Sequence, residues 1–141
     1  MTDQTLPSPS KRWGRSVLAV VAGFIAVVAL SIGFDELFYA LHIYPPRNQP
    51  MQAPALFALA LLQRSLAAVF GGWAAARLAP RAPMNHALIV GAIGLGISTL
   101  GAAVTRNMHL GPEWYAIGLM ATALPCAWLG GKLHRPTAVL P

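Results

Sequence analysis

The sequence contains very little charge. Charged residues make up only 10 % of its 141 positions, whereas hydrophobic residues make up 56 %. A soluble globular domain carries about 25 % charged residues, so this chain lacks the polar surface that a water-soluble fold needs. The shortage excludes an ordinary soluble domain and predicts that the lipid bilayer covers the outside of the fold.

Acidic residues and cysteine are scarce as well. Four Asp and Glu face ten Lys and Arg, which gives a net charge of +6. The basic residues lie at the ends of apolar runs, where anionic lipid headgroups would meet them, and not on one polar face. We therefore expect no nucleic-acid partner. The single cysteine, Cys126, excludes an internal disulfide. The four histidines have no metal-ligand spacing, so we expect no metal and no cofactor.

Four long apolar runs dominate what is present. A bilayer core of about 30 Å requires about 20 helical residues at 1.5 Å each. The runs predict an all-α fold, a membrane four-helix bundle built of two antiparallel transmembrane hairpins. Its spans are expected at about 16–40, 55–78, 86–106 and 113–132. The segment 42–54 holds four prolines, so no helix continues through it.

The basic residues also predict an orientation. Seven of them fall on the side that holds both termini, and two fall on the other side. By the positive-inside rule, both termini lie in the cytoplasm of a bacterial inner (plasma) membrane protein. In this interpretation 1–10 is a disordered cytoplasmic tail, 11–135 is the four-span transmembrane domain, and 136–141 is a second cytoplasmic tail.

Several stretches of the chain carry a resemblance. They are Asp35 followed by YPP (44–46), then QR (63–64), GGWAAARLAPRAPMNHA (71–87), GPEWY (111–115) and LPCAWLGG (124–131). These stretches resemble a group of small, four-span bacterial inner-membrane proteins with no assigned activity. The resemblance implies the four spans and no catalytic residue.

Arg64 is the strongest single signal, because apolar residues surround it for about ten positions on either side. A central arginine costs about 2.5–3.5 kcal/mol on insertion scales, so an acidic partner is expected. Asp35 and Glu36 are the candidates. Neighbouring helical positions point about 100° apart, so only one of the two faces the bundle, and we expect Asp35. The pair is either a structural staple between two spans or a coupling site.

Small residues spaced four apart indicate close helix contacts, since they let backbones approach each other in lipid. These contacts are expected either inside the bundle or between copies of the chain. A homo-oligomer, or an unknown membrane partner, is therefore a second possibility. The glycines on which this prediction rests are Gly23, Gly71, Gly72, Gly96, Gly130 and Gly131.

Three functional classes follow. The favoured one is a non-enzymatic structural or accessory membrane protein. The alternative is a small dimeric proton-coupled transporter that uses Asp35 or Glu36 with Arg64. Small multidrug-resistance transporters have a similar length and span number, but their membrane acid lies in the middle of the first span. An intramembrane enzyme ranks last, because the sequence lacks a histidine cluster and a pair of acids facing one cavity.

Overall fold

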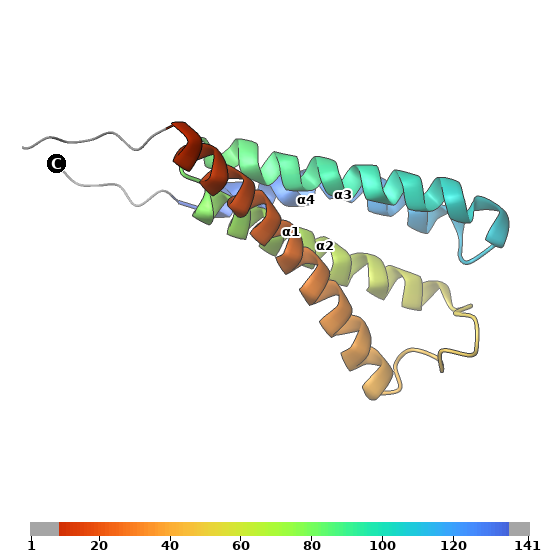
Figure 1. Cartoon of the computed structure of the whole chain (residues 1–141). Helices are drawn as coiled ribbons and strands as arrows, with labels where there is room; N and C mark the ends of the chain where they lie inside the picture. Colours follow the sequence, from red (N-terminus) through yellow and green to blue (C-terminus); the bar gives the residue numbers. More distant parts are fainter. Residues whose placement is uncertain (1–8, 136–141) are drawn as a thin grey trace, which may run out of the picture.

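The computed structural model describes residues 9–135, and the predicted tail 136–141 and residues 1–8 lie outside this range. The chain forms α1 (Pro9–Ala40), α2 (Pro54–Leu78), α3 (Pro83–Thr105) and α4 (Glu113–Leu133), with the short 3-10 helix η1 (Arg106–Met108) after α3 (Figure 1). All four α-helices are long and apolar enough to cross a membrane. The all-α fold and the multi-pass membrane class are therefore as predicted.

Prolines define the starts of the helices. Pro54 and Pro83 occupy the first turns of α2 and α3, and Pro112 directly precedes α4. The first turn of a helix leaves its N–H groups free, so proline loses no hydrogen bond there. Pro9 and Ser10 already belong to α1, although the sequence analysis assigns them to the disordered tail.

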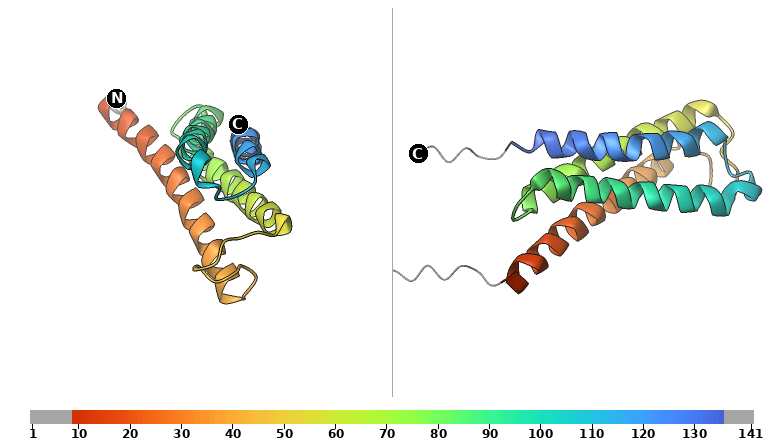
Figure 2. Two further views of the ribbon diagram at one scale, coloured as in Figure 1. Left: turned by 90° about the vertical axis from the view of Figure 1, so that its right-hand side faces the viewer. Right: turned by 90° about the horizontal axis from the view of Figure 1, so that it is seen from above.

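The helices run up and down as two antiparallel hairpins (Figures 1 and 2). We call the end formed by residues 41–53 and 106–112 the loop end. The opposite end, with the start of α1, the turn at 79–82 and the end of α4, is called the terminal end. α2 packs against all three other helices. α1 crosses the bundle obliquely and diverges from α3 toward the loop end (Figure 1).

Glycines create the closest contacts of α1 with α2. A Cβ added at Gly23 would lie 2.7 Å from the carbonyl oxygen of Gly71, and one added at Gly71 would lie 2.7 Å from that of Gly23. Real Cβ atoms do not come this close to backbone atoms. The two predicted residues therefore lie at a contact that only glycine permits.

The remaining predicted glycines, with one exception, also lie at close contacts between helices. Gly72 approaches the backbone of Ala127, which joins α2 to α4. A Cβ at Gly130 would lie 2.7 Å from the backbone nitrogen of Trp73, and one at Gly131 would lie 2.9 Å from the Cβ of Ala87. Each of these three glycines thus lies where two helices meet.

Gly96 does not lie at a contact between helices of this chain, so its predicted role in packing inside the bundle is wrong, whereas a contact between copies stays a prediction. Among the described residues nothing comes within 4 Å of a Cβ added there. The α3 glycine that meets α4 is Gly91, whose added Cβ would lie 2.7 Å from the Cβ of Ala127. Five positions separate the two glycines, so they point about 140° apart on the helix. Gly96 consequently faces outward.

The interior of the bundle is built of small side chains, while large apolar side chains point outward. The most exposed of these include Leu18, Leu100 and Ile117. Such an arrangement suits lipid, since helices in a bilayer associate through close packing of small residues and not through burial of large ones. The buried apolar residues are mainly alanines, namely Ala19, Ala60, Ala67, Ala75, Ala76, Ala87, Ala123 and Ala127.

Candidate functional site

The predicted pair of Asp35 and Arg64 exists and joins α1 to α2. Nη2 of Arg64 donates to Oδ2 of Asp35 at 2.9 Å. Nε2 of Gln63 donates to the other carboxylate oxygen, also at 2.9 Å. Two consecutive residues of α2 thus bind both oxygens of one carboxylate. The Asp35 side chain is 25 % exposed and that of Arg64 is 38 % exposed, so the pair is only partly buried.

Gln63 is a residue of this site that the sequence analysis missed. It is 3 % exposed, and its side-chain oxygen is buried without a hydrogen-bonding partner among the described residues. The available signal was its position next to Arg64, in a span that is otherwise apolar. A buried amide is unfavourable unless it is hydrogen-bonded. The position of Gln63 within the span therefore predicts a hydrogen-bonding partner, as that of Arg64 does.

Glu36 takes no part in this cluster. Its carboxylate pairs with Arg47 of the loop, and both side chains are more than half exposed. The Arg47 guanidinium also lies over the ring of Tyr39, 4.9 Å from its centroid. Glu36 therefore connects the end of α1 to the loop at the surface, and the structure separates the two neighbouring acids as predicted.

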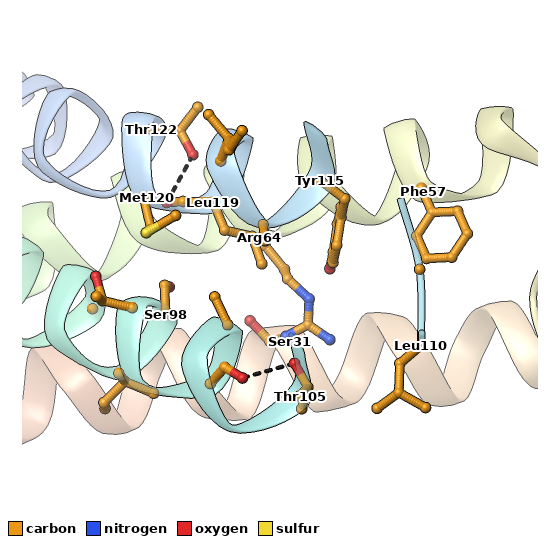
Figure 3. Close-up of a pocket in the computed structure, with 18 of the residues that line it drawn as sticks. Ser31, Phe57, Arg64, Ser98, Thr105, Leu110, Tyr115, Leu119, Met120 and Thr122 are labelled. Atoms are coloured by element: carbon orange, nitrogen blue, oxygen red, sulfur yellow. Dashed lines mark hydrogen bonds between the residues drawn. The ribbon is translucent and has the colours of Figure 1, made fainter. Parts of the chain in front are cut away.

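A cavity of about 820 Å³ lies among the four helices in the half of the bundle nearest the loop end. Arg64 projects into it, close to Ser31 of α1 and Tyr115 of α4 (Figure 3). Pockets for small ligands typically measure about 300–1,000 Å³. The cavity is therefore large enough for a ligand, and it contains the one charged side chain at the middle of a span.

The cavity wall changes in polarity along its length. Toward the loop end it holds the charged residues Arg64, Arg106 and Glu113, with Ser31, His109 and Tyr115, among apolar residues such as Phe57, Leu110 and Ile117. Toward the middle of the bundle it is mostly apolar, with Phe24, Val27, Val28, Ala68, Ile97 and Met120, and it includes Ser98 and Thr122. A cavity with its charged residues at one end and a mostly apolar wall elsewhere matches an amphiphile.

Threonines in the cavity wall add little to its polarity. The hydroxyls of Thr99, Thr105 and Thr122 each donate to a carbonyl one turn earlier in the same helix, at 2.7–2.8 Å. A hydroxyl used in this way satisfies its own helix. The guanidinium of Arg64 is consequently the main polar group away from the rim of the cavity.

Arg64 retains unused hydrogen-bonding capacity. A guanidinium has five N–H donors, and Asp35 is the hydrogen-bonding partner found for it among residues 9–135. Its Nε is buried without a partner in the same range. Leaving a buried donor unpaired costs about 1–3 kcal/mol, so the polar cluster is an incomplete network.

Tyr44, in the loop after α1, is a second residue that the sequence analysis missed at this site. It is buried against the rings of Phe38 and Tyr39, at centroid distances of 5.2 and 5.4 Å. Burial, together with the nearby Asp35 carboxylate, raises the pKa of Tyr44 to about 12, although Arg64 acts in the opposite direction. Its hydroxyl is therefore neutral at physiological pH and has no hydrogen-bonding partner among the described residues.

The fold and the cavity together define a multi-pass membrane protein with an amphipathic cavity at one end of a four-helix bundle. Within residues 9–135 no three His, Cys, Asp or Glu side chains are grouped as metal ligands would be. No family model matches the chain, and no curated protein and no solved structure is significantly similar to it.

Proposed function

We propose that this chain is a non-enzymatic accessory membrane protein that binds an amphiphilic molecule within the bilayer. The observation that carries the proposal is the cavity, whose charged residues lie toward the loop end and whose remaining wall is mostly apolar. An amphiphile held there would bury its apolar part against helix side chains and keep its polar part near the membrane surface.

The placement of the acids supports a binding role over a catalytic one. Glu113 lines the rim of the cavity with His109, and among residues 9–135 no second acid lines the cavity. Asp35 is bonded to Gln63 and Arg64, and Glu36 is bonded to Arg47 outside the cavity. General acid–base catalysis needs groups within reach of the same reacting atom, and this distribution of partners does not favour it.

Binding of a fluorescent fatty-acyl probe to the purified protein in detergent tests the proposal. Ala102 of α3 lines the cavity, so Ala102→Phe should obstruct part of it and weaken saturable binding. Ala92→Phe is the matched control, because Ala92 is an exposed residue of the same helix outside the cavity. Absence of saturable binding to the unmodified protein, or equal binding by Ala102→Phe, would refute the proposal.

A dimeric proton-coupled transporter is a second candidate, favoured by the contact between the cavity residue Arg64 and the acid Asp35. Protonation of Asp35 would release the guanidinium toward a substrate. Glu36, the other acid of this hypothesis, lies outside the cavity, so coupling would rest on Asp35 alone. Substrate flux into liposomes under a pH gradient, lost in Asp35→Asn, would support transport over simple binding.

We further propose a bacterial inner-membrane location with both termini in the cytoplasm. The resemblance of the sequence to small inner-membrane proteins supports the location. Basic residues at the terminal end support the orientation, and two of them lie over tryptophans, Arg77 over Trp73 at 5.6 Å and Lys132 over Trp128 at 4.2 Å. A C-terminal fluorescent-protein fusion should fluoresce, and a C-terminal alkaline phosphatase fusion should be inactive. The reverse pattern would overturn the orientation.

A further inference from the structure

We infer that the ligand of the cavity is a single-chain amphiphile with an anionic headgroup, which the guanidinium of Arg64 binds, and that it enters from the bilayer between α1 and α3. This inference rests on the proposed amphiphile-binding function and specifies its ligand. Three observations carry it: the charge of the cavity wall, the depth of the guanidinium, and the exposed edges of the gap.

The charge of the cavity wall favours an anion. The charged residues that line it are Arg64, Arg106 and Glu113, whereas Asp35, which pairs with Arg64, does not line it. Asp35 binds Arg64 through one nitrogen, and the guanidinium has further N–H donors. A carboxylate or a phosphate can accept two parallel hydrogen bonds from an arginine. A cationic headgroup would instead be repelled by the two arginines of the cavity wall.

The guanidinium lies at a depth that suits a headgroup. Asp35, its partner, is five residues before the end of α1 at Ala40, or about 7–8 Å along the helix. The Arg64 backbone is deeper, ten residues into α2, but the long side chain reaches back toward the membrane surface, as arginines in membranes do. The headgroup of a bound amphiphile would therefore remain close to the level of the lipid headgroups.

Below the guanidinium, the cavity continues between mostly apolar side chains. Phe24 lies eleven residues before Asp35 on α1, or about 16 Å along the helix. Ala68 of α2 and Met120 of α4 line the same deep part. A total volume of about 820 Å³, shared between headgroup and tail, favours one chain over two.

The gap between α1 and α3 offers a path from the bilayer. The two helices diverge toward the loop end, as Figure 1 shows. Ile32 on α1 and Ile97 on α3 both line the cavity, and both are more than half exposed. The edges of the gap are thus apolar, so an alkyl chain can pass between them without leaving an apolar environment.

Chain-matched probes test the headgroup. Hexadecyl phosphate, hexadecanoate, hexadecylphosphocholine and hexadecanol should be titrated against the full chain in a maltoside detergent at mildly alkaline pH, with native mass spectrometry as readout. We expect at least one of the two anions to bind about tenfold more tightly than the zwitterion and the alcohol, which corresponds to about 1.4 kcal/mol. The two anions distinguish a phosphate from a carboxylate as the preferred headgroup.

Three variants assign the preference to Arg64. The Arg64→Gln change alone would leave the Asp35 carboxylate without its cation and endanger folding, so the double variant Asp35→Asn/Arg64→Gln is used. It should bind all four probes with similar affinity. Asp35→Asn should keep or increase the preference for anions, because Arg64 no longer shares its charge with a carboxylate. Glu36→Gln is the control, since Glu36 pairs with Arg47 outside the cavity, and it should leave the preference unchanged.

The outcomes separate this inference from the function on which it rests. Equal binding of all four probes by the unmodified protein, or an anion preference that persists in the double variant, overturns the assignment to Arg64 while amphiphile binding stands. Binding of none of the probes overturns both.

A cross-link tests the entry path. Cysteines placed at Ile32 and Ile97 in a Cys126→Ser background are joined by a bismaleimide, which should slow probe uptake from vesicles. Unchanged uptake overturns lateral entry.

Discussion

Asp35 and Glu36 are consecutive residues of α1, yet their carboxylates bind arginines from different parts of the chain. Asp35 pairs with Arg64 on α2, and Glu36 pairs with Arg47 in the loop. The rotation of about 100° between adjacent helical residues explains the separation. The first pair joins two spans inside the bundle, whereas the second joins a helix end to its own loop at the surface.

The pair inside the bundle should show strong energetic coupling. Asp35→Asn and Arg64→Gln should each lower the free energy of unfolding in detergent by about 1–3 kcal/mol, because each leaves a charged or polar partner unpaired. The double variant should lose clearly less than the sum of the two single losses. Strictly additive losses in this double-mutant cycle would mean that the pair does not hold α1 to α2.

The surface pair should contribute much less. Both side chains are more than half exposed, and exposed ion pairs contribute about 0.2–1 kcal/mol in double-mutant cycles. Glu36→Gln should therefore change the unfolding free energy by less than about 1 kcal/mol, and added salt should reduce the difference. A loss as large as that of Asp35→Asn would show that Glu36 has a structural role beyond its pairing with Arg47.

Two glycine-to-alanine changes should have opposite effects. Gly130→Ala places a methyl group against the backbone of α2 and should destabilise the protein by about 2–3 kcal/mol. Gly96→Ala meets open space and should be neutral or slightly stabilising, because alanine loses less backbone entropy in a helix. Thermal unfolding of the two purified variants makes the comparison. A strongly destabilised Gly96→Ala variant would point to a contact outside this chain, as in a homo-oligomer.

Tyr44 should make stability depend on alkaline pH. Its pKa is raised from 10.0 to about 12 in the folded protein, so the unfolded state loses the phenol proton first as pH rises. Stability attributable to Tyr44 is constant below pH 10 and falls by about 1–2 kcal/mol between pH 10 and 12. Tyr44→Phe should remove this decline and cost little at neutral pH, since the hydroxyl has no partner among the described residues. Parallel pH profiles of the two proteins would contradict the assignment.

The helices and the main ion pair could be predicted from the sequence because both depend on strong, local signals. Apolar runs of bilayer length leave no alternative to helices, since every backbone polar group must find a partner within the membrane. Arg64 in the middle of a span requires a partner, and Asp35 lies at a depth that its side chain can reach. These two arguments need hydropathy and helix geometry only.

The rest of the site depends on how the helices cross. Gln63 carries no charge, so it does not demand an ionic partner as Arg64 does, although it binds the same carboxylate. Tyr44 is buried because the loop folds back onto Phe38 and Tyr39, which no local pattern encodes. The cavity exists because α1 diverges from α3. A small residue such as Gly96 likewise does not reveal whether it faces a neighbouring helix or lipid.

Because α1 crosses the bundle obliquely, a small rotation of this helix about its contact with α2 moves its loop end by several ångströms. Gly23 of α1 lies against Gly71 of α2, and Ala40 lies seventeen residues further on, or about 25 Å along the axis. A rotation of about 10° around this point would move Ala40 by about 4 Å. A methyl group added at Gly23 would therefore change the width of the gap at the loop end, whereas the hydrogen bonds of Asp35 hold the loop-end part of α1 against α2.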